Sequence, residues 1–168
     1  TMVVLGIPES LLSRKLEDVE LALPDYIKLA YLPAYNVIRL RLTGHAEEKG
    51  HLRNEMEGFF DQIALACGEH VLVRQDVEPM TYLCQWLMEK NISIAAAESC
   101  SGGMIAQRLV RNAGISAIYN GSINSYSNEI KVAELGVKTE TLAKHGAVSE
   151  ECALEMALGA RIKFGTQL

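Results

Sequence analysis

A polar segment that ends in proline divides this sequence into two parts. RQDVEP, residues 74–79, follows one set of apolar patterns and precedes another, and such a segment is typical of a linker. With 168 residues, the chain is long enough for one ordinary domain or two small ones, and the linker favours two. We therefore predict one α/β domain over residues 1–75 and a second over residues 76–168.

The first part alternates strand and helix patterns in an order that restricts its topology. Apolar alternation and helical spacing predict four strands and two helices. In chain order these are MVVLG, a helix over 9–23 ended by Pro24, YIKLAYLP, NVIRLRLTG after a PAYN hairpin, a helix over about 46–67, and HVLV. The order β-α-β-β-α-β is a split-βαβ arrangement, with an open sheet and its helices on one face.

The second part continues with helices and strands in alternation. The expected elements are a helix at MTYLCQWLMEK, a strand at ISIAAA, a helix over about 103–112, a strand at AIYNGSINSY, and helices near 128–135 and 149–164. This alternation predicts a three-layer α/β/α domain. Two strands are few for so many helices, and a further strand should follow RIKFGTQL. We therefore expect this domain to be incomplete, truncated at its C-terminal end.

Composition and charge exclude several classes of protein. No apolar run in the sequence approaches the roughly 18 residues of a membrane span, and its first residues lack the pattern of a secretory signal. The net charge is −5, and residues 1–76 carry 8 Lys/Arg against 12 Asp/Glu, a net −4. Nucleic-acid binding is disfavoured because neither half has a basic stripe. A cytoplasmic protein is expected.

The cysteines give no sign of a metal site or a disulfide framework. The sequence has four, widely spaced, with no C-x-x-C and no histidine at zinc-ligand spacing. Three of them lie within apolar helix patterns and are interpreted as small core residues: Cys67, Cys84 and Cys152. No metal and no cofactor are predicted.

The junction AAAESCSGG, residues 95–103, carries more reactive groups than a strand-to-helix turn needs. Unpaired backbone N–H groups at such a turn can hold an anion or a developing oxyanion. The simplest interpretation makes Ser99 or Ser101 a helix cap and Gly102–Gly103 a turn. The functional interpretation makes Ser99 a nucleophile, provided that a base lies near it.

A thiol offers an alternative nucleophile in the same loop. Cys100 would lie at a helix N-terminus, where thiol pKa values fall. Its usual partner is a histidine, and only His145 lies in this half of the sequence. We rank the Cys100–His145 hypothesis below the serine hypothesis.

A second group of functional side chains follows in YNGSINSYSNEIK, residues 119–131. Tyr126 and Lys131 are five residues apart, which on one helix would point them about 140° apart. They converge only if Tyr126 ends a strand and Lys131 lies in the first turn of the next helix, capped by Ser127 or Asn128. A lysine beside a buried tyrosine there could act as a base, although a solvated surface lysine is the commoner case.

In combination these motifs resemble the CinA family of competence/damage-inducible proteins. The resemblance lies in AESCSGG (97–103), YSNEIKVAELGV (126–137) and HGAVSEE (145–151). GIPES (6–10) and residues 27–44 are similar to the KH-like domain that precedes the family's C-terminal domain. Three ordered motifs at matching separations make a chance similarity improbable.

The resemblance implies a nicotinamide mononucleotide deamidase, an amidohydrolase of pyridine-nucleotide salvage that releases nicotinate mononucleotide and ammonia without a metal or cofactor. It implies that Ser99 is the nucleophile and that Tyr126 and Lys131 are catalytic. Substrate binding is assigned to Ser101, Gly102, Gly103 and Asn128. A homodimer is expected, and the family's Gly-rich loop after Leu168 is expected to be needed for activity. The alternative is a non-catalytic interaction or dimerisation module.

Overall fold

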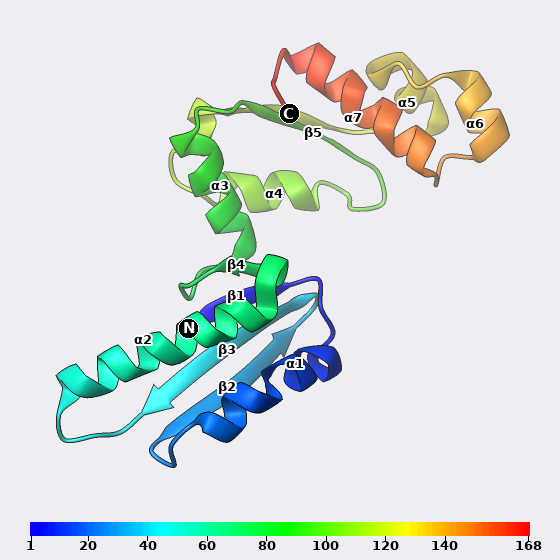
Figure 1. Ribbon diagram of the computed structural model, residues 1–168. Helices are drawn as coiled ribbons and strands as arrows, with labels where there is room; N and C mark the ends of the chain where they lie inside the picture. The colour runs from blue at the N-terminus through cyan, green and yellow to red at the C-terminus, as the bar shows by residue number, and fades with distance from the viewer. The chain divides into compact units, whose positions relative to one another are not determined.

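The computed structural model describes all residues from Thr1 to Leu168. The chain forms two compact units, Thr1–Pro79 and Met80–Leu168, and each is described by itself (Figure 1). No helix in either unit has the length and apolar character that crossing a membrane requires.

The first unit is a four-stranded antiparallel sheet with the strand order β2-β3-β1-β4. Its helices α1 and α2 lie on one face of the sheet (Figure 1), where they share a single core with the strands. This is the predicted split-βαβ arrangement. The elements are β1 (Met2–Leu5), α1 (Glu9–Ala22), β2 (Ile27–Ala34), β3 (Val37–Gly44), α2 (Lys49–Cys67), a 3-10 turn (Gly68–His70) and β4 (Val71–Val73).

The β2–β3 hairpin is tighter than the sequence suggests. Ala34 pairs with Val37, so the strands continue to within two residues of each other and only Tyr35 and Asn36 form the turn. Asn36 takes a left-handed backbone with φ of 55°, a conformation that asparagine tolerates better than most residues. The predicted four-residue PAYN connection is therefore two residues too long.

The second unit places two parallel strands between helices. Strands β5 (Ile94–Glu98) and β6 (Tyr119–Asn124) pair in parallel, and two apolar cores lie against their opposite faces. These are the three layers predicted for this part. The helices are α3 (Pro79–Glu89), α4 (Met104–Val110), a 3-10 turn (Ile115–Ala117), α5 (Asn128–Leu135), α6 (Thr139–His145) and α7 (Glu150–Phe164).

Helix α6 is absent from the sequence prediction because the residues at its start carry no capping signal. Its N-cap, Lys138, makes no side-chain cap hydrogen bond. The cap comes instead from α7, where the Glu155 carboxylate accepts hydrogen bonds from the Lys138 N–H and the Thr141 hydroxyl, both at 2.8 Å. A helix capped by a residue 17 positions away in the sequence leaves no local capping signal.

Helices α5 and α7 pack unusually closely at Gly159. A Cβ atom built on this residue would lie 1.9 Å from the carbonyl oxygen of Leu135. Only glycine lets the two backbones approach to this distance. Because α5 also carries Lys131, this contact positions one of the predicted catalytic side chains.

Candidate active site

Ser99 and Lys131 meet at the carboxyl ends of the two parallel strands. Glu98, the last residue of β5, pairs with Asn124, the last residue of β6, so the segments that follow the two strands start side by side. Ser99 follows β5, and Ser125 follows β6 before α5 begins. Ligand sites of open α/β sheets characteristically form at this edge.

Lys131 is buried, with only 2% of its surface exposed. Its Nζ lies 3.1 Å from the Ser99 hydroxyl oxygen and 2.6 Å and 3.3 Å from the carbonyl oxygens of Ser125 and Tyr126. The Ser127 hydroxyl caps α5 by accepting the Ile130 N–H, and this start puts Lys131 in the first turn of the helix. No carboxylate forms an ion pair with Lys131.

The hydrogen bonds around Lys131 fit both states of an acid–base group. An ammonium has three donors, enough for the two carbonyls and the Ser99 oxygen. An uncharged amine has two donors for the same carbonyls and a lone pair that can accept the Ser99 hydroxyl proton. The site can therefore hold the lysine before and after a proton transfer from Ser99 without rearrangement.

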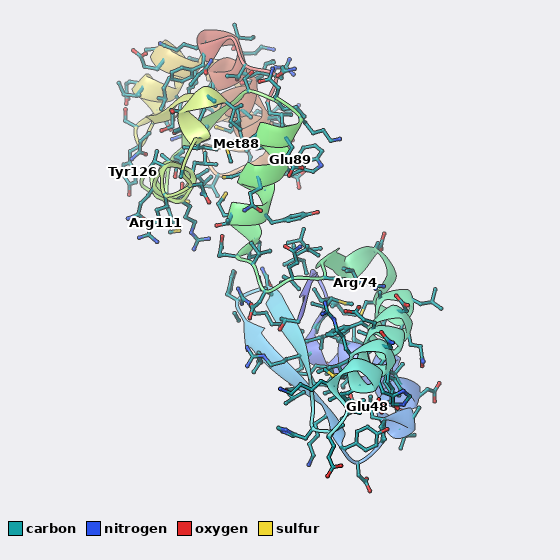
Figure 2. The ribbon with its side chains drawn as sticks, turned by 90° about the vertical axis from the view of Figure 1, so that its left-hand side faces the viewer. Glu48, Arg74, Met88, Glu89, Arg111 and Tyr126 are labelled. Carbon is teal, nitrogen blue, oxygen red and sulfur yellow. The ribbon has the colours of Figure 1, made fainter.

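Tyr126 is not the buried tyrosine that the sequence predicts. Tyr126 is 80% exposed, and it lies at the surface of its unit (Figure 2). It contacts Lys131 only through its main-chain carbonyl. Ser125 instead is fully buried, because side chains alternate as the chain leaves β6. Asn128 is also exposed, as the first residue of α5.

Glu98 is the site residue to which sequence reasoning assigned no role. Its side chain is 2% exposed, and its carboxylate accepts the backbone N–H groups of Ile105 at 3.0 Å and Ala106 at 2.9 Å. Burial by itself would raise the pKa of this carboxyl, but the hydrogen bonds from α4 and the preceding loop hold it below its ordinary value. Glu98 thus takes the capping role expected of Ser99 or Ser101, while the N-cap position itself is Gly103.

The loop after Ser99 uses only some of its backbone donors within the protein. The Gly102 N–H bonds to the Ser99 carbonyl at 3.1 Å, and the Gly103 N–H and the Ser101 hydroxyl face the Glu98 carboxylate, where they help to lower its pKa. The N–H groups of Cys100 and Ser101 have no hydrogen-bond partner within the protein. The backbone donors left free for an anion are therefore those of Cys100 and Ser101, nearer the start of the loop than Gly102 and Gly103, to which substrate binding was assigned.

Both loop glycines adopt backbone conformations that favour glycine. Gly102 has a φ of 61° and Gly103 a φ of 93°, a region that residues with a Cβ avoid. A Cβ at either position would meet no atom within 4 Å. The glycines are thus needed for the turn itself, rather than to avoid contact with neighbouring atoms.

The Cys100–His145 alternative gains no support. Cys100 is exposed rather than a packed neighbour of Ser99, and it makes no hydrogen bond with a histidine. His145 lies at the end of α6, with its Nδ1 3.1 Å from a carboxylate oxygen of Glu151. The other cysteines are buried, as predicted. No cluster of three or more His, Cys, Asp or Glu side chains is arranged to hold a metal ion.

Sequence profiles of known families identify both units. The profile of the CinA C-terminal domain matches residues 78–168, and that of the damage-inducible protein CinA KH domain matches residues 1–72. This chain belongs to the CinA family. The resemblance predicted from three short motifs is confirmed over both parts of the sequence.

Relatives and solved structures of the CinA family agree with this assignment. A CinA-like protein of Cytophaga hutchinsonii is 41% identical over 97% of this chain, and one of Chloroherpeton thalassium is 38% identical over all of it. The chain spans only 39% and 40% of their lengths. A CinA superfamily structure from Klebsiella pneumoniae has a TM-score of 0.51 and 37% identity, covering 52% of this chain and 54% of that one. One from Escherichia coli has a TM-score of 0.52 and 30% identity, covering 56% of each.

Proposed function

We propose that the second unit of this CinA-family chain carries the serine–lysine site of a nicotinamide mononucleotide deamidase. The observation that supports it best is the 3.1 Å contact between Lys131 Nζ and Ser99 Oγ. A buried amine beside a half-buried hydroxyl is the arrangement that a serine nucleophile needs, because the hydroxyl reacts only when a base takes its proton.

In the first step of the proposed reaction, Ser99 Oγ attacks the carboxamide carbon of the substrate. Lys131 takes the hydroxyl proton, and the carboxamide oxygen becomes an oxyanion. The two free N–H groups of Cys100 and Ser101 are the donors available to it. Lys131 then gives the proton to the amide nitrogen, the C–N bond breaks, and ammonia departs. The nicotinate mononucleotide acyl group remains bound to Ser99 Oγ as an ester.

In the second step, water completes the hydrolysis. Lys131 takes a proton from the water as its oxygen attacks the ester carbon, and returns that proton to Ser99 Oγ as the C–O bond breaks. Nicotinate mononucleotide is released and the site is restored. The two carbonyls of Ser125 and Tyr126 keep the amine directed at Ser99 throughout.

The exposed groups around the pair are available to the substrate. The Tyr126 ring offers an aromatic face to the pyridine ring. We propose this role for Tyr126 in place of the buried neighbour of Lys131 that the sequence predicted. Asn128 projects from the first turn of α5. Ser101 is half-buried in the nucleophile loop, and its hydroxyl would turn from Glu98 to reach the substrate. We assign the two loop glycines to the shape of this loop and the other three side chains to substrate contacts.

The test is ammonia release from nicotinamide mononucleotide. It should be run on this chain and on a chimera in which this chain replaces the matching residues of the Cytophaga hutchinsonii relative. Ser99→Ala and Lys131→Met should abolish release in whichever form is active, while Cys100→Ala should retain it. Release that survives Ser99→Ala but not Cys100→Ala would favour the thiol. No release from either form would favour a non-catalytic interaction module.

We also propose that the chain works as a homodimer. Helix α7 buries one apolar side in its core and exposes a second apolar row on another, so it has two surfaces to cover. Its first turn is acidic and its last turn basic, which favours antiparallel pairing with a second copy. The exposed row is Leu154, Leu158 and Ile162. Light scattering should show a dimer, and Leu158→Glu should yield monomers.

A further inference from the structure

Glu98 joins the two halves of the proposed active site. It precedes Ser99 in the chain, and its main-chain carbonyl accepts the Ser125 N–H at 2.8 Å. The Ser125 carbonyl in turn accepts a hydrogen bond from Lys131 Nζ at 2.6 Å. Glu98 therefore reaches the nucleophile through one covalent bond and the base through two hydrogen bonds.

The Glu98 side chain acts on the same loop from the opposite direction. Its two carboxylate oxygens bind separate N–H groups, Oε2 that of Ile105 and Oε1 that of Ala106. Residues 99–104 thus form a closed loop, fixed to β5 at one end and returned to the end of β5 by this carboxylate at the other. The backbone within it has little freedom to move Ser99.

The charge of Glu98 is balanced without a cation. No Lys, Arg or His forms an ion pair with it, and a buried carboxylate is costly unless its lone pairs are satisfied. Here the donors are the first-turn N–H groups of α4, where the helix dipole favours a negative charge. Because Glu98 occupies these donors, an anionic group of the substrate cannot use them.

We propose that Glu98 is a positioning residue for the Ser99–Lys131 pair. Its ionised carboxylate holds the loop so that Ser99 Oγ faces Lys131, and it leaves only the Cys100 and Ser101 N–H groups for the developing oxyanion. The substrate in this inference rests on the proposed function, but the effect on Ser99 reactivity does not.

The experiment measures Ser99 reactivity directly with a fluorophosphonate. Ser99 Oγ attacks phosphorus, fluoride leaves, and the hydroxyl proton passes to Lys131. Mass spectrometry gives both the final extent of labelling and its rate constant. The comparison is between the unaltered chain, Glu98→Gln and Glu155→Gln. Glu155 is the matched control, because its carboxylate also caps a helix of this unit. It lies on α7 and caps α6, so it makes no contact with the nucleophile loop.

We expect Glu98→Gln to label to the same final extent as the unaltered chain, with a rate constant lower by about 100-fold, the usual effect of misplacing a reacting group by about 1 Å. Glu155→Gln should label at the unaltered rate even if it lowers the melting temperature as much as Glu98→Gln does. A merely structural role for Glu98 would lower the extent, since unfolded chains do not react, and leave the rate constant of folded chains unchanged.

An unaltered rate constant in Glu98→Gln, or equal losses in both glutamine variants, would overturn this inference alone. Failure of the proposed substrate is a separate result. If Ser99 is labelled but no ammonia is released from nicotinamide mononucleotide, the labelling rates still test the positioning role of Glu98. If the unaltered chain shows no labelling at Ser99, both proposals fail together.

Discussion

The close contact of α5 and α7 allows a test in which one methyl group is expected to weaken both the fold and the proposed site. In Gly159→Ala, the new Cβ would lie 1.9 Å from the Leu135 carbonyl oxygen and 2.6 Å from its carbonyl carbon. Non-bonded carbon and oxygen atoms approach to about 3.3 Å at their closest. The two helices must therefore separate by roughly 1.4 Å.

The energy of this change has two opposing parts. Forcing extra volume into a packed site costs about 1–3 kcal/mol, occasionally more, and this contact is severe because both partners are backbone. Alanine in a helix interior recovers up to about 1 kcal/mol relative to glycine. We expect a net loss of about 2 kcal/mol in the unfolding free energy.

The matched control is another helix-interior glycine with open space around it. A Cβ on Gly58 of α2 would meet no atom within 4 Å, so Gly58→Ala should stabilise the first unit by about 0.5–1 kcal/mol. Urea unfolding measures both changes, with circular dichroism as a general signal. The single tryptophan, Trp86 of α3, reports on the second unit alone.

The same displacement should reach the proposed catalytic lysine. Leu135 and Lys131 lie on α5 one turn apart, so moving α5 by more than 1 Å moves Nζ away from Ser99. Ser99 labelling should slow by about 100-fold in folded Gly159→Ala. Unchanged stability and unchanged labelling would refute the close packing and its link to the site.

Three further outcomes are expected. Lys131→Met should lower the rate of Ser99 labelling by about 10²–10⁴-fold, the usual contribution of a general base, and Lys131→Arg should not restore it because arginine stays protonated. The lowered pKa of Glu98 means that its charged form stabilises the fold above the ordinary carboxyl pKa. This stability is lost as the pH falls from that value through the lower folded value. Urea unfolding at pH 7 and at about pH 3 should show this loss, and Glu98→Gln should reduce it. Iodoacetamide should modify one thiol of the native chain, Cys100, and all four after denaturation, since the other three are buried; rapid modification of more than one native thiol would contradict this.

Periodicity and turn chemistry were sufficient to predict the main elements of both units. The β-α-β-β-α-β order leaves few ways to arrange the first sheet, and the observed order β2-β3-β1-β4 is one of them. The place of Lys131 in the first turn of a helix capped by Ser127 followed from the spacing and the serine cap, but the Tyr126 ring does not converge with it. These features are local, or follow from connection rules that local patterns satisfy.

What escaped prediction depends on contacts between distant residues. Helix α6 is capped by Glu155 from α7, and α4 by Glu98 from β5. In both cases a carboxylate replaces the Ser, Thr, Asp or Asn that marks a helix start in sequence. Tyr126 was misplaced for a related reason: a motif shows which residues act together, but not whether one contributes its ring or its carbonyl.

The parallel pairing of β5 and β6 also has a consequence for folding. A parallel pair cannot close through a tight turn, so α4 and the 3-10 turn at Ile115–Ala117 must lie between the strands before Ser99 and Lys131 meet across 32 residues of chain. Such long-range pairing is slow compared with helix formation. Reactivity at Ser99 should therefore return later in refolding than the helical circular-dichroism signal. The time course of Ser99 labelling would then report when the two parallel strands pair.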